Sequence, residues 1–137
     1  MRLGKAPALG VFAVSYLAGH HREGPVQARE IAEALGVPPD YLLKILQQLV
    51  KARILVSTRG PAGGFSIIRP PEEISLLTVV EAVGGPLDGQ VEVYGERLES
   101  QEVKSALDLA CREGTRLARE LLAGTNILAT TADSPGQ

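Results

Sequence analysis

This chain has little sulfur, few aromatic side chains and no long hydrophobic run. Its 137 residues include one cysteine, one methionine, no tryptophan, three tyrosines and two phenylalanines. A lone cysteine excludes an internal disulfide framework, and with so few aromatics the core must be built mainly from aliphatic side chains. No segment approaches the roughly 20 consecutive apolar residues that a membrane span needs. We therefore expect one modest domain with an appended element and no membrane partner.

Sequence signatures of catalysis are also missing. The chain shows no nucleophile–base pair and no triad of metal ligands. The glycine-rich residues 60–64 are not followed by the Gly-Lys-Ser/Thr sequence of a phosphate-binding loop. The N-terminal apolar stretch superficially resembles a signal peptide, but it is short and continues into the first expected helix. The sequence therefore predicts a cytoplasmic protein that is not an enzyme.

Charge is divided unevenly along the chain. Residues 1–69 hold nine lysines and arginines against four acidic residues, whereas residues 70–137 hold five against twelve. The two halves carry net charges of +5 and −7 within a total of −2. A basic half is typical of a module that binds a polyanion, and an acidic half would keep the rest of the molecule away from it. A chance distribution of surface charge is the alternative.

Apolar spacing and helix-ending residues predict a mainly α-helical fold with one small β-hairpin. Gly36 marks the end of one short helix, and Pro38 and Pro39 open the next, where proline is tolerated in the first turn. The acidic pair at residues 72–73 suits the start of a further helix. The expected elements are helices over residues 7–19, 27–35, 38–52, 76–83 and 100–123, with Leu9, Phe12, Ala13, Tyr16 and Leu17 on the inner face of the first, and a hairpin over residues 54–69.

The hairpin is the most informative stretch. Two β-branched, apolar runs flank a loop that holds three glycines, one proline and a single cation, Arg59. A small basic tip of this kind suits the minor groove of DNA, because narrow grooves attract arginine. An ordinary hairpin turn, in which glycine only supplies unusual backbone angles, is the alternative.

A helix, a glycine turn, a second helix and a hairpin follow one another in the order of a winged helix-turn-helix, whose second helix enters the major groove. In residues 38–52, leucines and isoleucine form one face, and polar side chains that could reach base edges or phosphates form the other. A merely solvated surface is the alternative, and Leu43 is an apolar residue on the polar face. The expected DNA-contacting residues are Tyr41, Lys44, Gln47, Gln48, Lys51, Arg59, Gly60, Pro61, Gly63 and Gly64.

A family resemblance rests on one string of motifs. Tyr41-Leu, Leu49, Ile54-Leu-Val, Arg59-Gly-Pro-Ala-Gly-Gly-Phe and Arg69-Pro-Pro-Glu-Glu-Ile resemble the bacterial IscR/NsrR/CymR-type transcription regulators. The resemblance covers roughly residues 1–87 and is weaker beyond them. It implies a dimeric regulator, in most members a repressor, with a winged-helix domain and a long dimerisation helix.

The resemblance also implies particular contacts and one departure. DNA contacts are implied at Tyr41, Lys44 and Arg59. The recognition helix departs from familiar members at Asp40, Leu43 and Lys44, so the resemblance does not carry an operator sequence over to this chain.

The long helix carries an apolar stripe at three- and four-residue spacing. Ala110, Gly114 and Ala118 are small residues four apart, which would let a second helix approach closely. Cys111 lies on the stripe, so a packed thiol is favoured over a redox sensor, which would need exposure and a lowered pKa. Gly114 could instead break the helix. The expected dimerisation residues are Leu107, Ala110, Cys111, Gly114, Ala118 and Leu121.

Many members of the resembled family bind an iron–sulfur cluster through three cysteines between the wing domain and the long helix. Residues 85–105 of this chain contain no cysteine, and one thiol alone cannot hold a cluster. His20 and His21 form a pair that could bind metal, although solvated loop histidines are favoured. We therefore expect no cluster, no metal site and no cofactor; a redox- or metal-responsive site with nonstandard ligands is the alternative.

Together these patterns predict a homodimeric, sequence-specific DNA-binding repressor that acts on double-stranded operator DNA. A winged-helix module that binds a protein is the alternative function. The sequence leaves open whether a small-molecule effector acts on it. The expected organisation is a winged-helix domain over residues 1–84, a linker or degenerate sensor loop over 85–99, a dimerisation helix over 100–125 and a flexible tail over 126–137.

Overall fold

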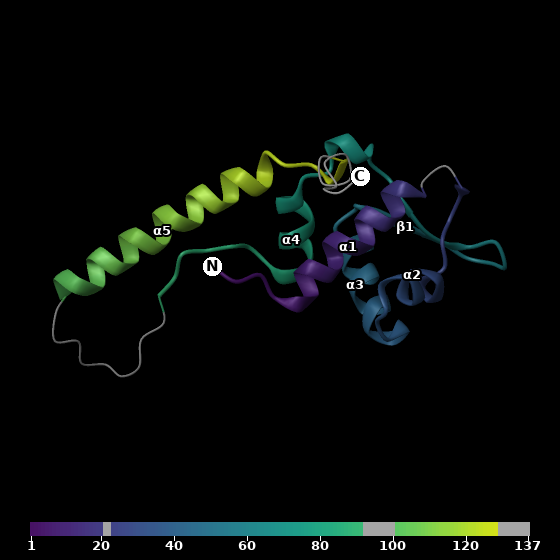
Figure 1. The fold of residues 1–137 in the computed structure, drawn as a ribbon, viewed down its shortest axis with the longest axis horizontal. Helices are drawn as coiled ribbons and strands as arrows, with labels where there is room; N and C mark the ends of the chain where they lie inside the picture. The colour runs from purple at the N-terminus through teal and green to yellow at the C-terminus, as the bar shows by residue number, and fades with distance from the viewer. Residues whose placement is uncertain (21–22, 92–100, 129–137) are drawn as a thin grey trace, which may run out of the picture.

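The computed structural model describes residues 1–20, 23–91 and 101–128. Four short helices and a hairpin form one body, and a long helix extends away from it on the side opposite the hairpin (Figure 1). The expected order of elements is confirmed. The elements are α1 (Lys5–Gly19), α2 (Ala28–Leu35), α3 (Pro39–Lys51), β1 (Leu55–Thr58), β2 (Gly64–Ile67), the 3₁₀ helix η2 (Pro71–Glu73), α4 (Leu76–Gly84) and α5 (Gln101–Ala123).

The core is aliphatic, as expected, and lies between α1, α3 and α4. Gly10 of α1 lies against α4 so closely that a Cβ there would come within 2.8 Å of Val83 Cγ2. Leu9, Ala13 and Leu17 are buried, but Phe12 is 59% exposed, so its assignment to the inner face was wrong. Residues 10 and 12 lie on nearly opposite sides of a helix, and the contact at Gly10 therefore turns Phe12 outward.

The turn between α2 and α3 forms as the glycine and prolines predict. Gly36 ends α2 in the left-handed conformation at φ +70°, and its amide donates to the carbonyls of Ala32 and Glu33. Pro39 is the first residue of α3, where its missing N–H costs nothing. The buried side chains of α3 are Leu42, Ile45, Leu46 and Leu49, the apolar face expected from the sequence.

The hairpin is a two-stranded antiparallel sheet, and a segment of the loop between α1 and α2 lies beside it. Leu55 pairs with Ile67, and Thr58 pairs with Gly64 at the tip. On the outer side of β2, Val26 and Phe65 exchange two backbone hydrogen bonds, of 3.0 and 2.7 Å. The loop between α1 and α2 therefore fixes the wing to the helical body.

α4 begins at Leu76 as expected, but the acidic pair before it does not form its first turn. Glu72 and Glu73 lie in η2, and Ser75 caps α4 by accepting a 3.1 Å hydrogen bond from the Thr78 amide. A serine N-cap satisfies a free helix amide directly, which a carboxylate several residues upstream cannot do.

The chain after α5 returns to the winged-helix body. Asn126 forms a β-bridge with Ser75, and the Ile127 amide donates to the Ile74 carbonyl at 2.9 Å. Ile127 is fully buried, so the start of the expected flexible tail, at residue 126, was wrong. Residues 129–137, like residues 92–100 of the expected linker, lie outside the described residues.

Candidate nucleic-acid interface

One face of α3 presents the side chains predicted to contact DNA. Tyr41, Lys44, Gln47, Gln48 and Lys51 are all exposed. They are held there because the leucines and isoleucine on the other face are buried, which fixes the rotation of the helix. The arrangement meets the geometric requirement for a recognition helix.

Leu43, the apolar residue among these polar ones, has a structural explanation. Its side chain is half-buried and packs against the hydrophobic core. It therefore stabilises the position of α3 and is not free to reach a base.

Arg53, just after α3, is a further cation on this surface and was not among the DNA contacts expected from the sequence. Arg53 is exposed and has φ +61°, the one positive φ among the described residues other than glycine. This conformation lets the Ile54 amide donate to the Leu49 carbonyl at 3.0 Å and so ends the helix. Glycine usually occupies this position, because the left-handed conformation costs other residues about 1–2 kcal/mol. Because residue 53 is not glycine, the sequence carries no signal of this left-handed turn.

The wing tip presents three of its five predicted contact residues. Arg59, Gly60 and Pro61 are exposed. Gly63 is buried, and the backbone packs so closely around it that a Cβ there would lie 2.1 Å from the Thr58 carbonyl oxygen. Gly64 is half-buried, and its Cβ would lie 2.4 Å from the Val26 carbonyl oxygen. These two glycines shape the wing, so we assign them a structural role in place of a DNA contact.

The electrostatics of this surface favour an anionic partner. Lys44 and Lys51 on α3, Arg53 after it and Arg59 on the wing are all exposed. Among the described residues none of the four takes part in an ion pair. Cations that the protein does not neutralise itself are available to phosphates, and each phosphate contact releases a counterion.

Comparison with known proteins decides the family. The model of a family described as Rrf2, iron-dependent transcriptional regulator, matches residues 4–131. The chain belongs to the Rrf2 family. This confirms the resemblance drawn from the recognition helix and the wing.

This Rrf2 chain has regulators among its relatives. It is 35% identical over 88 residues to the HTH-type transcriptional regulator IscR of Aliivibrio salmonicida (strain LFI1238), a match that covers 64% of this chain and 52% of that protein. The chain therefore spans about half the length of the curated relatives it matches. These relatives are named as transcriptional regulators.

Solved structures confirm the winged helix-turn-helix fold. IscR of T. potens aligns with a TM-score of 0.75 at 26% identity, covering 97% of this chain and 88% of that chain. CymR (YrzC), the global cysteine regulator of B. subtilis, aligns with a TM-score of 0.77 at 23% identity and covers 98% of both chains. The long C-terminal helix of the Rrf2 protein is part of both alignments.

The expected dimerisation stripe of this Rrf2 protein lies on a helix that has no buried residue. Leu107 is 47% exposed and Leu121 is 74% exposed, while Cys111 and Ala118 are half-buried. The helix is continuous through Gly114, so the alternative that this glycine breaks it was wrong. Cys111 is not a core thiol within a single chain. An apolar stripe this exposed is available to a second copy of the helix.

The donor set of this Rrf2 protein does not fit an iron–sulfur cluster. The chain has one thiol, Cys111, and no group of three possible metal ligands occurs in the part of the chain that the structure describes. His20 stacks on Tyr16 at 4.2 Å, and its Nδ1 lies 2.7 Å from the Tyr16 carbonyl oxygen. His21 lies outside the described residues, so the expected histidine pair is not placed.

Proposed function

We propose that the protein is a homodimeric transcriptional regulator that binds operator DNA and represses transcription in the cytoplasm. The observation that carries this proposal is the set of exposed cations on α3, after it and on the wing, none of which pairs with an acidic residue in the part of the chain that the structure describes. Family membership supports it independently. No helix among the described residues is long and apolar enough to cross a membrane.

In this proposal α3 enters the major groove, where Lys44 and the two glutamines read base edges. Arg59 enters the adjacent minor groove, and Gly60 beside it adds no side-chain bulk. Lys51 and Arg53 contact phosphates, which adds affinity but no sequence information.

Arg59→Ala tests the role of the wing. We expect operator affinity to fall about tenfold to hundredfold and the dependence of log affinity on log salt to become shallower by about one. Fluorescence anisotropy over a salt series, with DNA selected from a random pool, measures both. Arg116→Ala, which removes the same charge from α5, is the control and should bind like the wild type. Unchanged affinity of Arg59→Ala at matched salt would remove the minor-groove contact, and weak salt dependence of the wild type would favour a protein partner.

Gly114→Leu tests the dimer contact. A leucine at the centre of the stripe would hold two helices apart at the point where small residues let them meet, so we expect dissociation to monomers at micromolar concentration. Analytical ultracentrifugation measures the oligomeric state. Ser105→Leu, which adds a leucine to the opposite face of the same helix, should leave the dimer intact. A complete dimer of Gly114→Leu would place the contact elsewhere.

We further propose that the protein works without an iron–sulfur cluster, because Cys111 is a single thiol on a helix with no other thiol available to it. Anaerobically purified protein should lack stoichiometric iron and the visible absorption of thiolate-bound iron. A strong band with one cluster's complement of iron per chain would contradict this proposal.

A further inference from the structure

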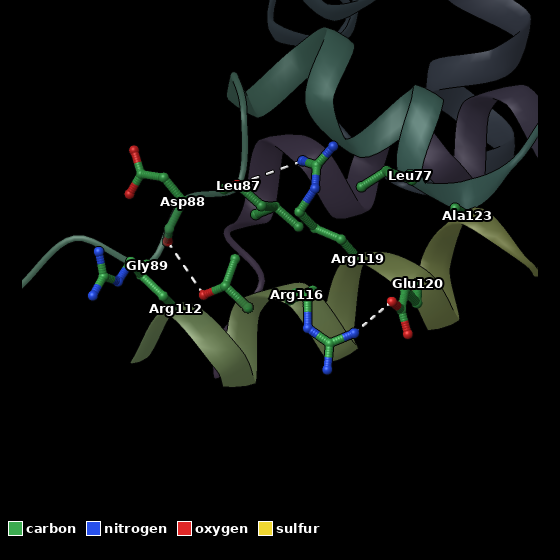
Figure 2. Close-up of a pocket in the computed structure, with 10 residues that line it drawn as sticks. Leu77, Leu87, Asp88, Gly89, Arg112, Arg116, Arg119, Glu120 and Ala123 are labelled. Atoms are coloured by element: carbon green, nitrogen blue, oxygen red, sulfur yellow. Dashed lines mark hydrogen bonds and ion pairs between the residues drawn. The ribbon is translucent and has the colours of Figure 1, made fainter. Parts of the chain in front are cut away.

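The carboxylate of Glu81 on α4 links the DNA-binding body to both the segment after α4 and α5. Glu81 on α4 accepts a 2.8 Å hydrogen bond from the Leu87 amide at Oε2. The same oxygen accepts from Arg119 Nη1 of α5, which also donates to the Leu87 carbonyl at 3.5 Å. Figure 2 shows Arg119 reaching from α5 to Leu87. Glu81, Leu87 and Arg119 therefore connect three separate parts of the chain.

The segment after Leu87 is pressed against α5. A Cβ on Gly89 would lie 2.6 Å from the Cα of Arg112, so no other residue fits there without movement of the backbone. Thr115 Oγ1 donates to the Asp88 carbonyl at 3.4 Å. The close approach holds residues 87–89 at a fixed distance from the helix.

A pocket of ≈ 400 Å³ lies between α4, residues 87–89 and α5, which is in the size range of small-molecule sites. Leu77, Leu87 and Ala123 supply apolar walls, and three arginines of α5 supply cations. The lining is completed by Asp88, Gly89, Thr115 and Glu120. An apolar lining with a few cationic groups suits a small organic anion with an apolar body.

The charges around the pocket leave cationic donors available. Arg116 is paired with Glu113 at 2.8 Å and Glu120 at 2.7 Å, and the hydrogen bond and charge of Glu113, followed by the charge of Glu120, raise its pKa. Asp88 accepts from the Gln90 amide and turns its carboxylate away from α5 (Figure 2). Arg112 makes no ion pair with any residue that the structure describes.

Arg119 is the cation best placed to hold an anion. A guanidinium has five N–H donors, and the contacts of Arg119 to Glu81 and Leu87 both use Nη1. Its side chain is 38% exposed, so an anion in the pocket can reach the remaining donors and draw the guanidinium away from Glu81.

The pocket and the dimer stripe lie on opposite faces of α5. Successive helix residues are rotated by about 100°, which places Arg112 and Arg119 roughly opposite Gly114 and Leu121, with Ala118 at the edge of the stripe. A dimer formed through the stripe therefore leaves the pocket open.

We propose that this pocket binds a small organic anion that competes with Glu81 for Arg119 and thereby changes the affinity of the protein for DNA. The inference rests on the proposed function, because it assumes a dimer whose two α3 helices must match the operator. Replacing Glu81 at Arg119 loosens α4 from α5. That alters the orientation of each DNA-binding body relative to its partner.

The binding test uses anilinonaphthalene sulfonate, an apolar organic anion, and phenylnaphthylamine, its uncharged counterpart, with fluorescence of the native dimer as readout. Arg119→Met keeps the apolar stem and removes the charge, so sulfonate affinity should fall about tenfold while amine affinity stays unchanged. Glu81→Gln still accepts from the Leu87 amide but no longer competes as a carboxylate, so sulfonate affinity should rise about threefold. Arg29→Met, which removes an exposed arginine of α2 that does not line the pocket, is the matched control and should behave like the wild type.

Equal sulfonate affinity in the wild type, Arg119→Met and Glu81→Gln would overturn the site. So would loss of sulfonate binding in Phe12→Ala, which would place the probe in the separate apolar pocket near Phe12 and Tyr41. If circular dichroism shows that Arg119→Met does not fold, the sulfonate affinities of Arg119→Lys and Glu81→Gln test the site in its place.

The coupling test repeats the DNA titration with saturating sulfonate. Operator affinity should change at least about fivefold in the wild type and stay constant in Arg119→Met. Sulfonate binding without an effect on DNA would overturn the coupling. If the wild type binds no DNA under any condition, the proposed function fails. The fluorescence measurements of sulfonate affinity still test the pocket independently of DNA binding.

Discussion

Replacing Gly64 with alanine is expected to disrupt the wing and to lower the free energy of unfolding by about 3 kcal/mol or more. Gly64 has φ +148°, a conformation that costs other residues about 1–3 kcal/mol. The new Cβ would also lie 2.4 Å from the Val26 carbonyl oxygen and 2.5 Å from its carbon. Relief requires separating Val26 from Phe65, which breaks both of their backbone hydrogen bonds.

Urea denaturation measures the loss of stability of Gly64→Ala, and anisotropy measures the accompanying loss of DNA affinity. Gly19→Ala is the matched control, because a Cβ at Gly19 meets nothing within 4 Å and its φ is not positive. We expect that control to stay within about 0.5 kcal/mol of the wild type. A Gly64→Ala variant as stable as the control would mean that β2 does not approach Val26 as described.

Ile127→Ala is expected to lower the free energy of unfolding by about 2–5 kcal/mol, the usual range for removing a fully buried isoleucine side chain. Ile127 lies in the core, and its amide bonds the Ile74 carbonyl, so the site cannot easily collapse around the cavity. The measurement is again urea denaturation, with dimer concentration held constant because oligomerisation shifts apparent stability.

The neighbouring Leu128 supplies the control for Ile127. It is 38% exposed, so Leu128→Ala should cost no more than about 1 kcal/mol. Similar losses for the two variants would mean that the chain after α5 is not anchored through Ile127. An Ile127→Ala protein as stable as the wild type would support the flexible tail that the sequence predicted from residue 126.

The short helices could be predicted from the sequence because their signals are local. Gly36 ends α2 and Pro39 begins α3 within one turn of the positions where these residue types are favoured. The burial of Ile127 could not be predicted in this way. A short Ile-Leu pair after the end of a helix shows no periodicity, and the burial of Ile127 depends on Ile74, which lies more than fifty positions away in the sequence.

The candidate site was predictable to a similar extent. The exposed polar face of α3 follows from the spacing of its leucines, since burying one face of a helix exposes the other. The left-handed turn at Arg53 was missed because glycine, its usual signal, is absent. Gly63 and Gly64 were correctly placed in the wing, but their close approaches to Thr58 and Val26 depend on tertiary contacts.

The return of the chain after α5 gives the long helix a second attachment to the DNA-binding body. One attachment is made by Glu81 and residues 87–89 to the arginines and Thr115 of α5, and the other is the Ser75–Asn126 bridge with buried Ile127 beside it. An anion that displaces Glu81 weakens only the first. In the proposed coupling, this bridge would be the pivot about which each DNA-binding body rotates at the end of α5 without separating from it. Ligand binding would therefore change the distance between the two recognition helices while the dimer remains assembled.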